Sequence, residues 1–239
     1  MDCEYSILIV GAAILVVPAT QDQTAYDDLV NSLLFAQLVA NKQMEKDQST
    51  PWYDCYMQFL DDFWPRDIKG REDWRIDADS HESFVDWIVP TISKASPAAG
   101  QAIDRVLTRL VNVPATHPAI NLLRTQMKKV SGAQVMPVPA PAENVHLLVL
   151  MAQSPTTFAS VFVELKTHQA LSLNPLAQLY SGEDIQGPVT LRYARANLSQ
   201  VSYGFVRDEV ALKVKERIAE NVATFDMNDE PGLTEEKQP

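Results

Sequence analysis

The sequence is poor in the residues from which nucleotide-binding and disulfide-stabilised proteins are built. It has only eight glycines in 239 residues, and it contains neither a P-loop nor a G-x-G-x-x-G motif. The two cysteines, Cys3 and Cys55, provide no disulfide framework. We therefore expect reduced thiols, no cofactor and a cytoplasmic location, although secretion by a route without a signal peptide stays open.

Basic residues are also scarce. The chain has 20 Lys and Arg against 31 Asp and Glu, which gives a net charge of −11. The densest basic groups are Lys128-Lys129 and the segment 213–217, and the second contains a glutamate among its basic residues. Nucleic-acid binding depends on clustered basic side chains that release counterions from phosphates. This charge balance argues against a nucleic-acid partner.

Motifs for enzymatic chemistry are absent as well. The four histidines are scattered, and no H-x-x-x-H, HExxH or G-x-S-x-G sequence occurs. Adjacent acids stand at positions 27–28 and 61–62. Neighbouring side chains on a helix point about 100° apart, so neither pair converges on one proton-transfer site. A protein without catalytic activity is the favoured expectation.

One short segment has the composition of a metal site. In an extended chain Asp77, Asp79 and His81 share one face, where they could converge on a cation. The EF-hand pattern fails, because Glu82 stands where that loop needs glycine and Ile88 where it needs glutamate. The alternative is that the segment caps the helix that follows it.

The N-terminal segment 5–19 is strongly apolar. It is too short to cross a bilayer as a helix, which needs about 20 apolar residues. The acidic residues Asp2 and Glu4 before it are unlike the basic start of a secretory signal. Its β-branched residues favour buried strands broken at Gly11, or a short core helix. Membrane insertion or an assembly contact is the alternative.

Helical periodicity dominates the next hundred residues. Apolar residues recur every three or four positions over about 24–41 and 51–63, which predicts a helical hairpin. Residues typical of helix caps, each followed by a further apolar stripe, predict three more helices. They lie within 79–89, where Pro90 interrupts the stripe, 96–111 and 116–129.

The pattern changes after a proline-spaced connector at 133–142. Short alternating or β-branched runs predict strands at 145–152, 157–166, 171–179 and 189–201. Recurring valines then predict a helix over 205–221.

The predicted fold class is α+β, with a helical bundle of about five helices, then a small antiparallel β-sheet or sandwich, then a C-terminal helix. The bundle and the apolar segment occupy 1–132, the β-rich part and last helix 143–222, and a disordered acidic tail 223–239. Since the last helix returns after the sheet, one α+β domain with a shared core is the alternative arrangement.

The leading functional hypothesis is a non-enzymatic binding or self-assembling protein that acts through protein–protein contacts, with another protein or itself as partner. Its predicted interaction surface comprises Ile7, Ile9, Ile14, Val16, Trp52, Tyr56, Phe59 and Trp64. A membrane-engaging toxin or effector using residues 5–19 is the first alternative, and membrane contact is not favoured. A metal-dependent hydrolase using Asp77, Asp79 and His81 is the second. The sequence identifies no small-molecule ligand.

Overall fold

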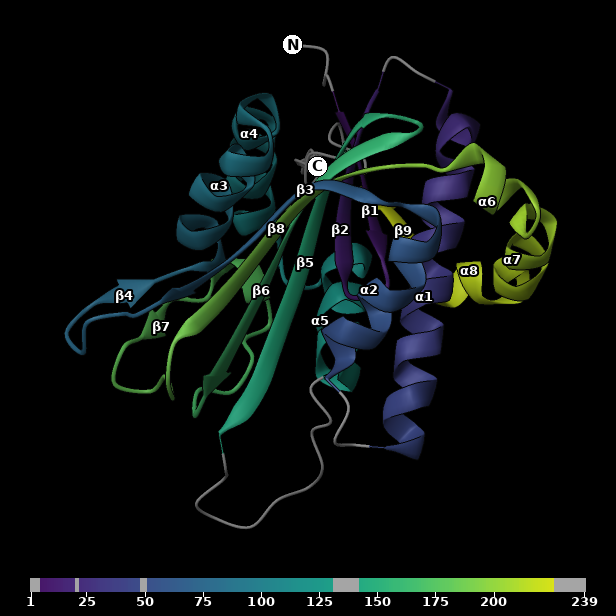
Figure 1. Cartoon of the computed structure of the whole chain (residues 1–239). Helices are drawn as coiled ribbons and strands as arrows, with labels where there is room; N and C mark the ends of the chain where they lie inside the picture. The colour runs from purple at the N-terminus through teal and green to yellow at the C-terminus, as the bar shows by residue number, and fades with distance from the viewer. Residues whose placement is uncertain (1–4, 20–21, 48–50, 131–141, 226–239) are drawn as a thin grey trace, which may run out of the picture.

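The computed structural model describes residues 5–19, 22–47, 51–130 and 142–225. Its centre is a seven-stranded sheet with helices on both faces (Figure 1). In chain order the strands of this sheet are β1 (Tyr5–Val10), β2 (Ala13–Pro18), β3 (Arg66–Trp74), β5 (Glu143–Ser154), β6 (Thr157–Thr167), β8 (Val189–Asn197) and β9 (Val222–Phe225). A separate two-stranded sheet pairs β4 (His81–Glu82) with β7 (Tyr180–Ser181).

The large sheet has the order β3-β8-β6-β5-β2-β1-β9. All neighbouring strands are antiparallel except β2 and β5, which are parallel. Strands from the first 75 residues and from the last 100 thus share one sheet, and the β2–β5 pairing joins them.

The helices divide between the two faces of the sheet (Figure 1). One face carries α3 (Phe84–Ala95), α4 (Pro97–Val111) and α5 (Pro118–Val130). The other carries α1 (Asp27–Lys46), α2 (Trp52–Phe63), α6 (Gln200–Gly204) and α7 (Arg207–Val214), with α8 (Ile218–Asn221) leading into β9. Short 3-10 turns are η1 (Gln23–Tyr26), η2 (Pro175–Ala177) and η3 (Lys215–Arg217).

Each face of the sheet contributes to its own hydrophobic core. In β2, Ile14 and Val16 pack toward α3, α4 and α5, whereas Leu15 and Val17 pack toward α1 and α2. A strand that is buried on both faces is apolar along its whole length. This is why the segment 5–19 is a continuous hydrophobic run.

The predicted fold class is wrong in its arrangement, although the mixture of helices and strands is confirmed. The N-terminus forms the β1–β2 hairpin inside the sheet, and the helices between residues 27 and 130 cover two sheet faces instead of forming a bundle. The predicted small β-part is a portion of the same large mixed sheet. The connector 133–142, apart from its last residue, lies outside the described residues. Of the tail predicted as disordered over 223–239, residues 223–225 belong to β9 instead, and the remainder lies outside the described residues.

Two local predictions also fail for identifiable reasons. Residues 171–179 were expected to form a strand, but they form a loop around η2, in which the Asn174 side chain donates to the carbonyl oxygens of Leu110 and Val113. The sequence pattern predicts no strand over most of β3, because its charged side chains hide the alternation of a strand. Charged residues are common on edge strands, where they discourage pairing with other chains.

A chain of buried amides fastens the hairpin turn to both helix layers. The Ala12 N–H donates to Gln37 Oε1 over 2.7 Å, and Gln37 Nε2 donates to Gln126 Oε1 over 3.3 Å. Gln126 Nε2 then donates to Asn221 Oδ1 over 3.0 Å, and the Gly11 N–H donates to the Asn221 carbonyl over 2.7 Å. The network fixes α8, and with it the start of β9, against the hairpin.

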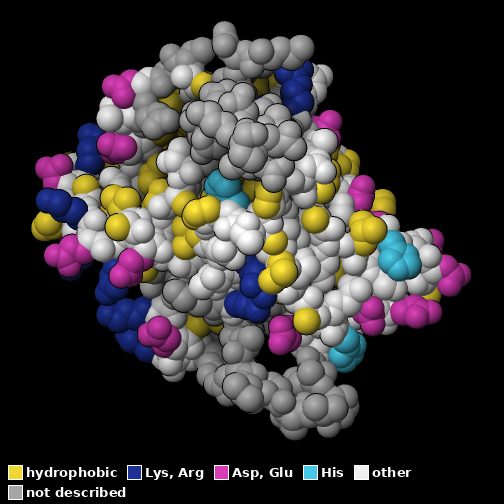
Figure 2. Space-filling model, turned by 180° about the vertical axis from the view of Figure 1, so that it is seen from behind, with side chains coloured by type: hydrophobic (Ala, Val, Ile, Leu, Met, Phe, Trp, Pro, Cys, Tyr) yellow, Lys and Arg dark blue, Asp and Glu magenta, His cyan; other side chains and the backbone are white. Residues whose placement is uncertain are grey.

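The surface opposite the view of Figure 1 mixes residue types. Figure 2 shows hydrophobic side chains scattered among charged ones, with Lys and Arg gathered mostly toward one side. None of the helices in the described parts of the chain is both long and apolar enough to cross a membrane.

Candidate functional site

The candidate metal ligands are exposed and lie at the tip of the β3–β4 connection. Asp77 and Asp79 belong to the loop before β4, and His81 pairs with Ser181 within the small sheet. Across the described residues, no group of three or more His, Cys, Asp or Glu side chains is placed to hold a metal ion. The next helix, α3, is capped by Ser83 and Asp86, which form a capping box.

The residues of the predicted interaction surface lie mainly inside the protein. Phe59 is half-buried between Phe35 and Phe63. The others are buried: Ile7, Ile9, Ile14, Val16, Trp52, Tyr56 and Trp64. The four aliphatic residues lie in β1 and β2, under the α3–α5 layer. The three aromatic residues pack between α2 and the opposite face of the sheet. These side chains stabilise the core in the structure described.

A polar cluster lies beside α2. His146 Nε2 is 3.1 Å from Glu164 Oε1, and Arg192 lies over the Tyr53 ring, 4.6 Å from its centre. The hydrogen bond with His146 is the main cause that lowers the pKa of the Glu164 carboxyl, and burial opposes it. The ring of His146 stacks against Trp52. These contacts hold α2 against the sheet, which is a structural role.

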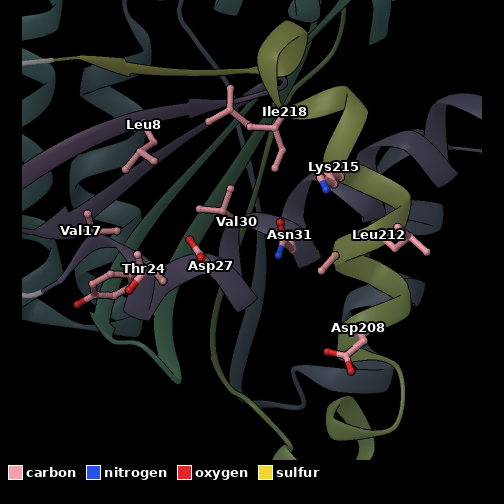
Figure 3. Close-up of a pocket in the computed structure, with 13 residues that line it drawn as sticks. Leu8, Val17, Thr24, Asp27, Val30, Asn31, Asp208, Leu212, Lys215 and Ile218 are labelled. Carbon is pink, nitrogen blue, oxygen red and sulfur yellow. The ribbon is translucent and has the colours of Figure 1, made fainter.

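An open groove lies between α1, the C-terminal helices α7 and α8, and the sheet edge formed by β2, β1 and β9 (Figure 3). Its volume is about 640 Å³. We call it the C-terminal groove and define it by its lining residues: Leu8, Val17, Thr24, Tyr26, Asp27, Val30, Asn31, Asp208, Ala211, Leu212, Lys215, Ile218 and Val222.

The floor of the C-terminal groove is apolar. Val17 and Tyr26 are buried beneath it, and Leu8, Val30 and Val222 are half-buried, so each presents part of its surface to the groove. These residues come from β1, β2, η1, α1 and β9. A ligand that covers them removes apolar surface from water, which is favourable.

The outer wall is held by a few contacts between α7 and the rest of the chain. Val210 and Val214 are buried, and Arg207 Nε lies 3.1 Å from both carboxylate oxygens of Asp28. Other apolar residues of this wall are much more exposed. Leu212 has 72% of its surface exposed, and Ile218 has 38%. Single exposed aliphatic side chains are common on protein surfaces, so the apolar floor and not this wall distinguishes the groove.

Polar groups are placed around the rim. Figure 3 shows Asp27 on α1 and Asp208 on α7 at opposite sides of the groove, with Asn31 between them and Lys215 farther along the helical wall, toward Ile218. The pKa of Asp27 is raised, first by burial and then by the carboxylates of Asp28 and Asp22. The groove thus combines an apolar floor with a small number of charged groups.

Comparisons with known proteins leave the family of the chain open. No protein-family model and no curated protein sequence matches it. A solved structure described as "Structure of the Evf virulence factor" is similar over 89% of this chain and 82% of that chain, with 11% sequence identity and a TM-score of 0.33. A similarity at this level supports no conclusion about function.

The sequence reasoning missed the groove because its residues are far apart in the chain. They come from three strands, two 3-10 turns and three helices, and only folding brings them together. One local signal was available. Val206, Val210, Val214 and Ile218 repeat every fourth position, and Leu212 lies off this stripe on a short helix. An apolar residue opposite the buried stripe indicates a second apolar contact.

Proposed function

We propose that this is a non-enzymatic binding protein whose C-terminal groove receives a small molecule with an apolar body. The observation that carries the proposal is the groove itself. Its volume of about 640 Å³ lies within the range of about 300–1,000 Å³ that is usual for small-molecule sites. Its floor is apolar, and its polar groups are few and lie at the rim, which is the usual division of roles in such sites.

The expected affinity is modest. Burying an apolar chain contributes about 0.8 kcal/mol for each methylene removed from water. A chain of about eight carbons therefore gains roughly 6 kcal/mol, from which the cost of immobilising the ligand is subtracted. A net gain of about 4 kcal/mol corresponds to a Kd of about 1 mM. Titration with 1-octanol, followed by NMR chemical shifts of the backbone amides, measures binding in this range.

The first prediction uses a matched pair of valines on α1. Val30 lines the groove, whereas Val39 does not line it and is partly exposed. We expect Val30→Asn to weaken 1-octanol binding about tenfold, because a polar group in the floor must give up water without gaining a partner. Val39→Asn places the same change on the same helix, and we expect its affinity to stay within about twofold of the native protein.

Binding is compared only between variants that fold. Each variant is checked by circular dichroism and thermal unfolding before titration. If Val30→Asn fails to fold, Leu212→Ser takes its place, with the exposed Leu173→Ser as its control outside the groove. Equal 1-octanol affinity in the groove variant and its control would contradict the proposed site. Chemical-shift changes confined to another region would contradict it too.

The protein or self partner expected from the sequence stays a prediction. The membrane-engaging alternative needs residues 5–19 to be accessible, but those from Ile7 to Val17 are buried or half-buried within the sheet. The metal-dependent alternative lacks a described cluster of ligands. The groove is therefore the better-supported site in the described chain.

A further inference from the structure

The charges at the rim of the C-terminal groove are unequal. Two carboxylates, Asp27 and Asp208, face the groove from opposite walls, and Lys215 contributes one ammonium group (Figure 3). Within the parts of the chain that the structure describes, neither carboxylate lies within ion-pair distance of a basic side chain. The rim therefore carries an excess of negative charge.

The neighbours of Asp27 increase that excess. The carboxylate of Asp28 is paired with Arg207, at 3.1 Å from its Nε, so most of its charge is compensated. Asp22 accepts a hydrogen bond from the Thr24 N–H over 3.0 Å, but it remains a carboxylate beside Asp27. A cation bound near Asp27 would offset the repulsion between these acids. Burial, together with this repulsion, raises the pKa of Asp27.

The helix dipole does not reverse this preference. Asp27 and Asp28 are the first residues of α1, where the unpaired N–H groups carry partial positive charge and attract anions. Asp27 already occupies that position, so part of its charge offsets the positive end of the helix. The rest of that charge and the carboxylate of Asp208 keep the rim negative.

We infer that the C-terminal groove prefers a ligand whose apolar body carries a cationic group, such as an alkylammonium ion, over a neutral or anionic ligand of the same length. This inference rests on the proposed function. The apolar body lies along the groove floor, and the ammonium group lies at the rim, against one of the two carboxylates. The excess of carboxylates over Lys215 determines the sign of the preferred ligand.

Three probes of equal chain length test the inference: octylammonium, 1-octanol and octanoate. At neutral pH and low salt, we expect octylammonium to bind about fivefold tighter than 1-octanol, and octanoate to bind more weakly than both. The factor follows from one charge pair at about 4 Å in a solvent-exposed setting. The preference should shrink at high salt, because exposed charges are screened.

The outcomes separate the two proposals. If none of the probes shifts groove resonances, the proposed function fails. If 1-octanol binds in the groove but octylammonium binds no better, the function stands and the charge preference is wrong. Tighter binding of octanoate also overturns the inference. Octylammonium binding that shifts resonances of acidic residues elsewhere, with none in the groove, overturns it as well.

A charge-matched pair of double variants locates the preference. Asp27→Asn with Asp208→Asn should reduce the affinity for octylammonium to that for 1-octanol. Asp62→Asn with Asp104→Asn changes the net charge equally but lies outside the groove, on the exposed faces of α2 and α4. This control should retain the preference. Equal loss in both double variants would assign the effect to overall charge and contradict a role of the rim.

Discussion

Gly11→Ala is expected to lower the free energy of unfolding by about 3 kcal/mol. Gly11 forms the β1–β2 turn with a φ of +60°, a conformation that costs other residues about 1–3 kcal/mol. An added Cβ would also lie 2.0 Å from Gln37 Oε1, so the Gln37 side chain would have to move. That movement breaks the hydrogen bond from the Ala12 N–H and disturbs the buried amide chain to Gln126.

Two other glycines separate the causes of this effect. Gly187 has a φ of +80° with no atom near its would-be Cβ, so Gly187→Ala carries the backbone strain alone. Gly204 has neither a positive φ nor a close neighbour, so Gly204→Ala should be neutral or slightly stabilising. Urea unfolding of the three variants gives the order. A loss at Gly11 no larger than that at Gly187 would mean that the Gln37 contact contributes nothing.

Trp64→Ala is expected to destabilise the protein by about 4 kcal/mol, the usual cost of truncating a fully buried large aromatic side chain. Trp64 follows α2, is fully buried, and packs against Phe158 of β6 with 5.2 Å between ring centres. Its removal leaves a cavity between α2 and the sheet, and a rigid core closes such a cavity only partly. The measurement is again equilibrium unfolding in urea.

A second tryptophan provides the control. Trp74, at the end of β3, is 48% exposed and donates from Nε1 to Glu82 over 2.9 Å. Trp74→Ala should cost about 1 kcal/mol, because it leaves no closed cavity and loses one exposed hydrogen bond. Trp64→Phe should fall between the two. In the described residues the Trp64 Nε1 has no hydrogen-bond partner, so phenylalanine removes an unpaired donor together with part of the volume. Equal effects of the two alanine variants would contradict the packing role of Trp64.

Local periodicity predicted much of the secondary structure. The stripe from Tyr26 through Leu38 marks α1, and the alternation of Val161, Val163 and Leu165 marks β6. The strand order was beyond reach, because β2 pairs with β5 across more than 100 residues of sequence. Nothing in the composition of either strand specifies that partner. A central strand that is buried on both faces is apolar at every position, and so is a short helix inside a core. The apolar segment 5–19 therefore fitted either structure, and the sequence did not decide between them.

The candidate site was predicted less well than the secondary structure. Trp52, Tyr56 and Trp64 were predicted at an interaction surface because their helix has more aromatic residues than a small core needs, but here they fill the core under α2. Burial depends on which elements cover a face, and a single segment does not reveal it. Lys215 and Asp27 lie about 190 positions apart in the sequence, and their meeting at one groove is a property of the whole fold.

The position of the β1–β2 hairpin affects how the chain must fold during synthesis. The hairpin is made before its neighbours β5 and β9, which are supplied by residues 143–154 and 222–225. β1 and β2 can pair with each other early, but the outer edge of β2 stays unpaired until β5 is made, and that of β1 until β9 is made. Distant pairings of this kind slow folding and expose apolar strand edges meanwhile. We therefore expect the nascent protein to depend on chaperones more than a chain of this size with sequence-local contacts.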